Sequence, residues 1–345
     1  MESGNPASRP DVTYILPIRS EAPQSGSELD RYLRWLADRA ETIVVDGSPD
    51  NVFQTHARAW GDFLRHVAPA PDLLTPMGKV GGVLTGVRLA MNERIVVGDE
   101  DVRYDETSLR QVVDALQYAD VVRPQNYFVP LPWHALWDTG RILLNRMMGG
   151  DWPGTVGVRR SALRATSGYD GRAMFENLEL VRTVRAAGGR EVALLDAYVL
   201  RRPSTARQFW SQRIRQAYDE LARPLRLVSQ LAILPAAVLV VATGRAAFLG
   251  LAAAAAILVA ELGRRRQGAA RYFPAAASPM VIAWLAERAV CSWLAIGSRV
   301  FLGGVAYRGR ILRHAATPLR TLRALHRGKL RPPTELRRRP RRRLA

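Results

Sequence analysis

Three acidic residues follow one short apolar run and carry the clearest chemical signal in the chain. Residues 95–97 are Ile-Val-Val, which favours a buried strand, and Asp99, Glu100 and Asp101 stand where that strand would end. In open α/β sheets, ligands bind beyond the carboxyl ends of the strands. Carboxylates at alternate positions there offer oxygen ligands to a divalent cation. Asp99 and Asp101 are therefore candidate metal ligands; a solvated acidic turn is the alternative.

A second apolar run also ends in an acid. Residues 42–45 are Thr-Ile-Val-Val, and Asp46, Gly47 and Ser48 follow them. A carboxylate at this place can accept hydrogen bonds from a nucleotide base or ribose, while the later acids can hold a metal that bridges a diphosphate. The two strand ends together indicate a site for a nucleotide diphosphate.

These acids lie within an alternation of strand and helix patterns. We expect strands at residues 12–18, 42–45, 95–98, 120–123 and 191–199, and helices at 28–40, 53–66, 83–91, 106–117 and 176–187. Alternation at this spacing predicts an α/β fold with a mostly parallel sheet and helices on both faces.

The motifs resemble, in order, those of the family-2 glycosyltransferases. The matching pieces are Ile15-Leu-Pro-Ile18, Val44-Val-Asp-Gly-Ser48, Gly78-Lys79, Val97-Gly-Asp-Glu-Asp101, residues 153–161, Phe175-Glu-Asn-Leu-Glu-Leu180 and Gln212-Arg-Ile-Arg-Gln216. They cover roughly residues 12 to 220. The resemblance implies a Rossmann-like GT-A domain over residues 12–203 and inverting sugar transfer from a nucleotide-diphospho-sugar.

The resemblance also implies roles for the acids. Asp46 would contact the nucleotide, Asp101 would bind the metal directly, and Asp99 would contact the ribose or the metal. Mg²⁺ or Mn²⁺ would neutralise the diphosphate as it leaves. Lys79, one of only two lysines in the chain, would lie near the diphosphate or the base.

Other segments would line the donor and acceptor sites. Gly154 and Thr155 belong to the segment that lines the donor-sugar pocket in the family. Gln212 and Arg215 match a Gln-x-x-Arg-Trp motif, with Gln216 in place of Trp. Arg213 and Arg215 are candidates for diphosphate contacts, or alternatively for contacts with lipid headgroups.

The catalytic base departs from the family pattern. Inverting transfer to a hydroxyl group needs a carboxylate, and the family has Glu-Asp where this chain has Glu176-Asn177. An amide has no useful basicity. Glu176 is therefore the expected base; the alternatives are Glu179, an acceptor that is already ionised, and altered chemistry.

The composition changes after residue 222. An amphipathic interfacial helix is expected over residues 204–222, followed by apolar runs at 227–243 and 246–262 that suit two membrane spans. A third apolar stretch, 279–305, contains Glu287 and Arg288, so it is either spanning or interfacial. The positive-inside rule places the catalytic domain in the cytoplasm, because arginines 264–266 follow the second run.

Charge and cysteine content limit the other possibilities. The net charge is +19, and the Arg-rich segment 306–345 is expected to be a cytoplasmic tail that suits anionic membrane lipids, with disorder beyond residue 310. Disorder is also expected for residues 1–11. The single Cys291 excludes an intrachain disulfide. A nucleic-acid binder would leave the apolar runs and the strand-end acids unexplained.

The sequence therefore predicts a multi-pass protein of the cell membrane. It would be an inverting glycosyltransferase that moves a sugar from a UDP- or GDP-linked donor to a lipid or lipid-linked acceptor, as in ceramide-glucosyltransferase-like members of the family. A non-catalytic membrane protein that binds nucleotide-sugars is the alternative.

Overall fold

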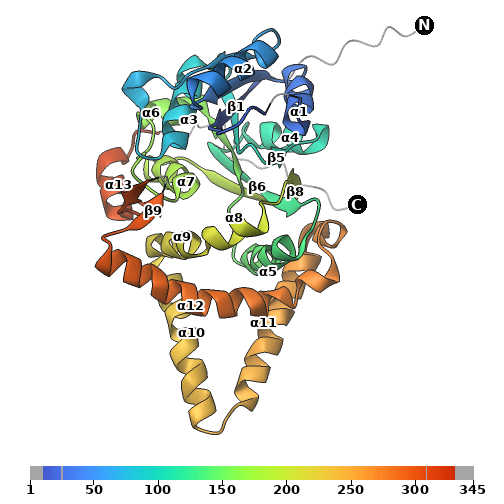
Figure 1. Ribbon diagram of the computed structural model, residues 1–345, viewed down its shortest axis with the longest axis vertical. Helices are drawn as coiled ribbons and strands as arrows, with labels where there is room; N and C mark the ends of the chain where they lie inside the picture. Colours follow the sequence, from blue (N-terminus) through green and yellow to red (C-terminus); the bar gives the residue numbers. More distant parts are fainter. Residues whose placement is uncertain (1–10, 25, 308, 331–345) are drawn as a thin grey trace, which may run out of the picture.

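A computed structural model describes residues 11–330 of the chain apart from 25 and 308 (Figure 1). Strand β1 (Val12–Ile18) is an inner strand of the main sheet in its α/β part. Its side chains alternate between the faces of the sheet, as a strand requires. Ile15 belongs to one hydrophobic core, and Tyr14 and Leu16 belong to another on the opposite face. Both faces of the sheet are therefore covered by helices.

The main sheet has eight strands in the order β3-β2-β1-β4-β7-β6-β8-β5. Its other strands are β2 (Glu41–Asp46), β3 (Arg65–Val67), β4 (Arg94–Gly98), β5 (Val102–Arg103), β6 (Val121–Phe128), β7 (Thr155–Arg159) and β8 (Glu191–Arg201). Strands β1 to β4 pair in parallel, and so do β6 and β8, whereas β7 and β5 pair antiparallel with their neighbours. The expected parallel-dominated α/β sheet is confirmed.

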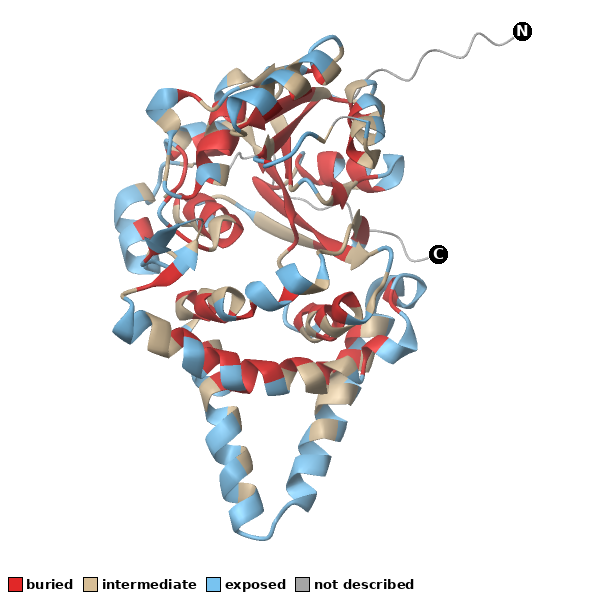
Figure 2. Cartoon of the chain, in the orientation of Figure 1, coloured by how far each residue is buried: buried red, intermediate tan, exposed pale blue. Residues whose placement is uncertain are grey.

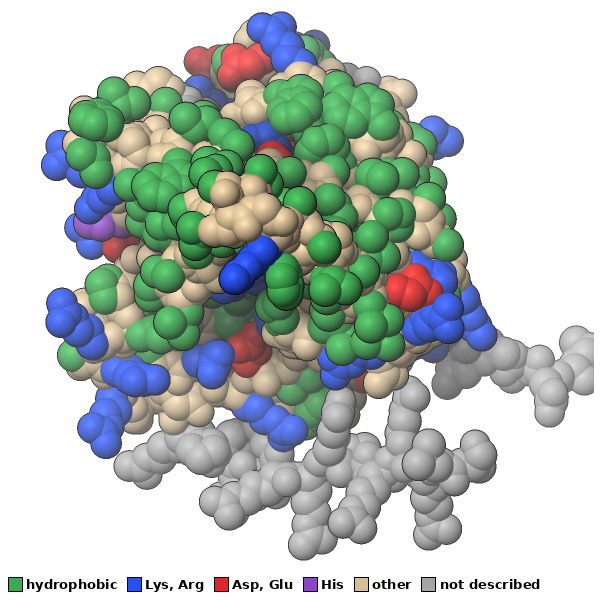
Figure 3. All heavy atoms as spheres, turned by 90° about the horizontal axis from the view of Figure 1, so that it is seen from below, with side chains coloured by type: hydrophobic (Ala, Val, Ile, Leu, Met, Phe, Trp, Pro, Cys, Tyr) green, Lys and Arg blue, Asp and Glu red, His purple; other side chains and the backbone are tan. Residues whose placement is uncertain are grey.

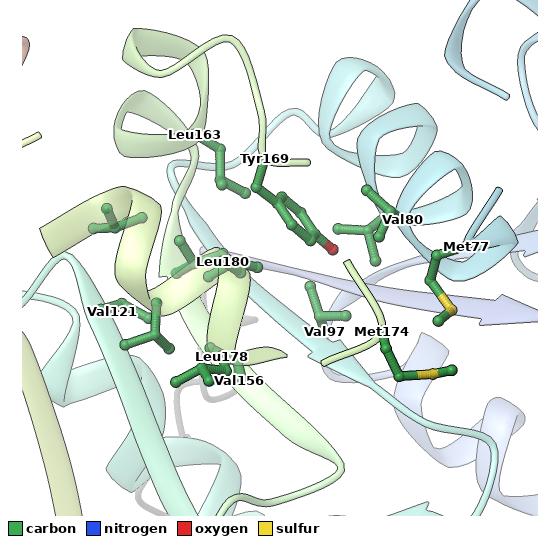
Figure 4. Packing of buried hydrophobic residues seen from close by; sticks show 14 of the residues in the cluster. Met77, Val80, Val97, Val121, Val156, Leu163, Tyr169, Met174, Leu178 and Leu180 are labelled. Atoms are coloured by element: carbon green, nitrogen blue, oxygen red, sulfur yellow. The ribbon is translucent and has the colours of Figure 1, made fainter. Parts of the chain in front are cut away.

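Helices pack on each face of this sheet. On one face lie α3 (Gly78–Leu89), α6 (Arg160–Ala165) and α7 (Glu176–Ala186), and on the other lie α1 (Glu28–Ala37), α4 (Glu106–Ala115) and the end of α2 (Asp50–Trp60). Figure 4 shows the first core, where Tyr169 lies among Leu163, Val80 and Val97. This core supports the start of α3 and the start of α7, which hold the candidate site.

Two helix boundaries differ by five residues or more from the sequence-based expectation. The helix expected to reach residue 66 ends at Trp60, because residues 65–67 instead pair with β2 as an edge strand. The helix expected from residue 83 begins at Gly78. Its glycines allow close packing rather than forming a loop: a Cβ on Gly82 would lie 2.9 Å from Cβ of Pro17 on β1.

A layer of helices lies beneath the sheet (Figure 1). It contains α5 (Trp133–Met147), α8 (Ala206–Ser211), α9 (Arg213–Tyr218) and α12 (Met280–Phe301). The single amphipathic helix expected over 204–222 is broken at Gln212. The break is stabilised by packing, because Arg213 turns inward and donates hydrogen bonds to Asp138 on α5.

An apolar hairpin projects from this layer. Its arms are α10 (Pro224–Ala242) and α11 (Ala247–Arg265), and nearly all of their outer surface is exposed (Figure 2). Both arms and α12 are long and apolar enough to cross a membrane. Helix α12 runs crosswise to the hairpin arms in Figure 1 and buries Glu287 and Arg288 against the protein. That packing explains how a charged pair is accommodated in an apolar helix.

The chain then returns to the α/β domain through β9 (Val305–Tyr307), β10 (Arg310–Leu312) and α13 (Leu319–His326). The expectation of disorder is therefore wrong for residues 319–326. Helix α13 is ordered because it packs against α7, with Leu322 buried. The disordered start expected at 1–11 and the tail end at 331–345 lie outside the described residues, apart from Asp11.

Candidate active site

Lys79 joins the acid that follows β4 to the first residue of α7. Its Nζ lies 2.5 Å from Oδ1 of Asp99 and 2.7 Å from Oε1 of Glu176. Burial acts to lower the pKa of Lys79, but the charges of Asp99 and Glu176 outweigh burial and raise it. Lys79 is therefore a cation fixed between the two carboxylates. The structure brings together three residues that were predicted from separate motifs.

Arg201, at the end of β8, contacts Asp99 and the second strand-end acid, Asp101. Its Nε donates a hydrogen bond to Oδ2 of Asp101 at 2.8 Å, and its Nη2 lies 3.5 Å from Oδ2 of Asp99. Arg201 was not predicted from the sequence as a site residue. No local motif marks it, because it reaches the acids only through the pairing of β8 with β5, in which Arg201 lies opposite Val102.

The acids suit a divalent cation. Oδ1 of Asp101 is buried and has no hydrogen-bond partner among the described residues. Burial raises the pKa of Asp101, and the charge of Asp99 adds to this while Arg201 opposes it. Three carboxylates face the two cations Lys79 and Arg201, so negative charge remains in excess. An unpartnered carboxylate oxygen in such a place is the ligand that Mg²⁺ or Mn²⁺ requires.

Gly154 leaves room for these side chains. Its carbonyl accepts a hydrogen bond from the backbone N–H of Asp99 at 2.8 Å. A Cβ at Gly154 would stand 2.7 Å from Oδ2 of Asp99 and 3.1 Å from Cζ of Arg201. Thr155 is different: its buried hydroxyl donates to the carbonyl of Val97 at 2.6 Å. Thr155 thus joins β7 to β4 inside the sheet.

Asn177 and Glu179 are both occupied by contacts that hold α7 in place. The amide of Asn177 donates to the carbonyl of Pro153 at 3.0 Å. Oε2 of Glu179 accepts a hydrogen bond from the backbone N–H of Thr317 at 2.8 Å, and burial raises the pKa of this carboxyl. Glu176 is consequently the carboxylate of α7 that lies among the acids and Lys79.

Asp219 supplies another carboxyl group that the sequence analysis missed. It begins a short 3₁₀ turn (Asp219–Ala222) after α9, and its Oδ1 is buried with no hydrogen-bond partner among the described residues. Burial and then the charge of Glu176 raise the pKa of Asp219 to about 8, against opposing contributions from Arg215 and Arg223. The raised pKa favours the protonated form of Asp219, close to Glu176.

The Gln212–Gln216 segment is divided between two environments. Arg213 is buried, and its Nη1 lies 2.7 Å from Oδ1 of Asp138 and 3.6 Å from Oε2 of Glu287. Arg213 therefore connects α9 to α5 and α12. Gln212 forms the break between α8 and α9. Arg215, by contrast, is partly exposed over the ring of Tyr307 and acts on the pKa of Asp219.

Asp46 is fixed by two histidines rather than presented to solvent. Its Oδ2 lies 2.7 Å from Nδ1 of His56 and 3.1 Å from Nε2 of His66, and its Oδ1 accepts from the N–H of Ser48. Although burial opposes it, hydrogen bonds from His66, Ser48 and His56 lower the pKa of Asp46. The buried carboxylate thereby orders the loop that follows β2.

The same three side chains form a possible metal cluster, with their ligand atoms within 4.8 Å of one another. The backbone N–H of Gln24 donates to Nε2 of His56 at 2.8 Å. That hydrogen bond makes Nε2 the acceptor, so the proton of a neutral His56 is on Nδ1, facing Asp46. A protonated Nδ1 cannot bind a metal, and the arrangement is that of a hydrogen-bonded cluster.

Comparisons with known proteins support the fold. No protein-family model matches the chain, and no curated protein matches its sequence. A mannosyltransferase from Pyrobaculum calidifontis, solved with GDP-Man and Mn²⁺, is similar in structure with a TM-score of 0.52 and 20% identity, over 86% of this chain and 88% of that one.

More distant similarities are to TarS of S. aureus, solved with UDP-GlcNAc, and to glucosyl-3-phosphoglycerate synthase of Mycobacterium tuberculosis. TarS has a TM-score of 0.41 and 17% identity, over 58% of this chain and 60% of that one. The synthase has a TM-score of 0.39 and 17% identity, over 58% and 74%. On the first of these comparisons, this chain has the GT-A fold, with apolar helices added after it.

Proposed function

We propose that the chain is an inverting, family-2 type glycosyltransferase of the cell membrane. It transfers a sugar from a UDP- or GDP-linked donor to a lipid or lipid-linked acceptor. The observation that carries this proposal is the meeting of Asp99, Asp101, Lys79, Arg201 and Glu176 at one edge of a GT-A sheet. The first similar structure, a mannosyltransferase, was solved with GDP-Man and Mn²⁺.

The donor's diphosphate would be held at the two strand-end acids. Asp101, through its unpartnered Oδ1, and Asp99 would bind Mg²⁺ or Mn²⁺, which supplies Lewis-acid neutralisation of the leaving diphosphate. Lys79 and Arg201 already lie against these carboxylates and would direct N–H groups toward phosphate oxygens as charge develops on them. Asp46, by ordering the loop after β2, would shape the nucleoside end of the pocket.

Glu176 is the residue proposed to take the acceptor's proton. It lies at the start of α7, and its Oε1 is 2.7 Å from Nζ of Lys79, which holds this carboxylate beside Asp99. Asn177 cannot substitute for it, because its amide is not basic and is engaged with Pro153. An acceptor that is already ionised would need no base, so the effect of removing Glu176 distinguishes the two acceptor classes.

The apolar helices favour a lipid acceptor and a membrane location. Seen from below, hydrophobic side chains cover most of the hairpin face, and Lys and Arg side chains lie mainly near its edge (Figure 3). Such a surface suits the apolar part of a bilayer bordered by anionic headgroups. With arginines 264–266 at the end of α11 on the cytoplasmic side, the catalytic domain faces the cytoplasm, where we expect the nucleotide-sugar donor.

Asn177 supports one other candidate, a membrane protein that binds nucleotide-sugars without transferring them. In that case the acids would bind donor and metal, and no carboxylate would accept the acceptor's proton. The proximity of Glu176 to Asp99, through Lys79, favours catalysis. A nucleic-acid-binding role has no comparable support, since acids converge at the site.

The test uses detergent-purified protein and a panel of UDP-, GDP- and TDP-sugars, with and without Mn²⁺. Release of nucleoside diphosphate is followed in the presence of membrane lipid extract, for the parent, Asp101→Ala and Glu176→Gln. Arg172→Gln is the matched control, because its side chain is 73% exposed and, among the described residues, pairs with Asp170 alone.

We expect metal-dependent release that both site variants lose and the control keeps. Loss with Asp101→Ala alone would indicate an ionised acceptor or a different base. Metal-dependent donor binding without turnover under any lipid would support the non-catalytic alternative. Failure of every nucleotide-sugar to bind would refute the proposed function.

A further inference from the structure

The segment after α12 contacts both ends of the helix that carries Glu176. We define the C-terminal strap as residues 313–330, which include α13. Near the start of α7, the backbone N–H of Met174 donates to the carbonyl of His314 at 2.8 Å, and that of Phe175 donates to Ala315 at 3.0 Å. At the other end, the N–H of Leu330 donates to the carbonyl of Ala187 at 2.9 Å.

Helix α7 lacks a side-chain cap, and these bonds hold the residues just before it. Phe175 is its N-cap residue and provides no side-chain hydrogen bond to the first turn. The start of a helix is usually fixed by such a bond. Here the residues just before Glu176 are instead fixed by a parallel bridge between Ala173 and His314. The strap therefore determines where α7 begins, and Glu176 is its first residue.

Glu179 gives the strap a second attachment, one turn into the helix. Its side chain is fully buried, and Oε2 accepts a hydrogen bond from the backbone N–H of Thr317 at 2.8 Å. Its Oε1 is buried without a hydrogen-bond partner among the described residues. Burying a carboxyl group in this way is costly, so an apolar residue would be expected here if packing alone mattered.

The strap is also attached to the helical layer beneath the sheet. The carbonyl of Arg313 accepts hydrogen bonds from the hydroxyl of Tyr218 on α9 at 2.7 Å and from Nη1 of Arg299 on α12 at 2.6 Å. The strap thus connects α12, one of the candidate membrane helices, to the residues next to Glu176.

We propose that the C-terminal strap positions α7 so that Glu176 meets Lys79 and Asp99, and that Glu179 is the positioning residue of this contact. Glu179 acts through Thr317 and α7, and it touches none of the reacting groups. Through the strap, the position of Glu176 thereby depends on the position of α12. This inference rests on the proposed glycosyl transfer for its kinetic consequences, but its structural part can be measured without activity.

The test compares Glu179→Gln with Glu179→Leu in the full-length protein. Gln keeps an oxygen that accepts the hydrogen bond from Thr317, whereas Leu has a similar size and no acceptor. Arg185→Gln is the control on the same helix, because its side chain is 64% exposed and Glu191 is its one ion-pair partner in the part of the chain that the structure describes. The readouts are kcat, the Kd of nucleoside diphosphate with Mn²⁺, and hydrogen exchange at the amides of Met174 and Phe175.

We expect Glu179→Leu to lower kcat about tenfold or more, as a misplaced catalytic group does, with the Kd within about twofold of the parent. Exchange at Met174 and Phe175 should become faster. Glu179→Gln and Arg185→Gln should keep parent behaviour. A kcat in Glu179→Leu equal to the parent's, or equal losses in the Leu and Gln variants, would overturn the proposal.

If Glu179 had a purely structural role, Glu179→Leu would raise the Kd and lower both Tm and kcat. That result would also overturn the proposal that Glu179 is a positioning residue. If the parent itself shows no metal-dependent transfer, the proposed function fails separately. Hydrogen exchange then decides the structural part: unchanged protection of Met174 and Phe175 in Glu179→Leu would show that the contact does not hold the start of α7.

Discussion

The candidate site depends on charges that neutralise one another at short range. Lys79 contacts Asp99 and Glu176, and Arg201 contacts Asp101 and Asp99. Asp101 nevertheless keeps one buried oxygen without a hydrogen-bond partner among the described residues. Such a cluster is pre-organised for a further cation and for the phosphates that accompany it, because no new residue must move in to form it.

Arg201→Lys should impair transfer although it keeps the charge. The guanidinium spans both acids, with Nε on Asp101 and Nη2 near Asp99, and a lysine ammonium is a single point that cannot span them. We expect kcat/KM to fall on the order of tenfold, a typical loss for an electrostatic donor. Steady-state kinetics with the best donor measure it, and Arg172→Lys is the exposed control. An unchanged kcat/KM would show that the guanidinium of Arg201 does not contribute to transfer.

Gly154→Ala should weaken donor binding. The added methyl group would stand 2.7 Å from Oδ2 of Asp99 and force that carboxylate to move. We expect an increase of about tenfold or more in the Kd of the donor with Mn²⁺, since small displacements of catalytic groups are costly. Titration calorimetry measures this. Gly78→Ala is the matched control, because a Cβ there meets nothing within 4 Å. Equal Kd values for the two variants would contradict the prediction.

Asp219→Asn should flatten the pH dependence of stability. The pKa of Asp219 is raised to about 8, so the folded state retains a proton that the unfolded chain releases at lower pH. Stability from this group is therefore present in acid and lost as the pH rises toward 8. We expect the Tm difference between pH 5.5 and pH 8 to shrink by about 2–4 °C. Thermal unfolding in detergent measures it; an unaltered difference would argue against the raised pKa.

At the scale of elements, the sequence predicted local features better than contacts between distant segments. Asp99 and Asp101 were identified because they directly follow an apolar strand, and the helices at 28–37 and 106–115 follow their apolar periodicity. Arg201 and Asp219 were missed, since only strand pairing and helix packing bring them to the site. Residues 65 and 66 were misassigned to a helix because pairing of residues 65–67 with β2 overrides their local pattern.

The hairpin α10–α11 carries a prediction about membrane attachment. Val238 is 61% exposed and Leu251 is 65% exposed, in a region where an apolar surface is otherwise unexplained. Replacing both with Asp should release much of the protein from membranes at alkaline pH, because an acid within a spanning helix is costly, up to about 2.5–3.5 kcal/mol at the helix centre.

The matched control for the hairpin is Leu74→Asp, which alters an equally exposed leucine of the α/β domain. Sedimentation of carbonate-washed membranes measures the bound fraction. If the hairpin double variant stays in the pellet as the control does, these helices are not the membrane anchor.

At the scale of the whole molecule, the α/β sheet, the layer of helices and the apolar hairpin follow one another along the long axis. The GT-A sheet holds the acids, the layer of α5, α9 and α12 lies beneath it, and the apolar hairpin extends away (Figure 1). The strap then returns from α12 to α7. We propose that an acceptor with a long apolar part reaches the acids from the side of the hairpin, as transfer to a lipid would require.

The transfer of a radiolabelled sugar into lipid is the decisive test of the proposed metal-dependent glycosyl transfer to a lipid acceptor. The full-length protein in lipid vesicles would be given labelled donor and Mn²⁺, and label would be counted in the organic phase for the parent and for Asp101→Asn. We expect the parent to transfer label into lipid. Asp101→Asn should transfer on the order of a hundredfold less label, because the charge of the proposed metal ligand is lost. Label that remains wholly in water-soluble products, or that reaches lipid equally in both proteins, would contradict it.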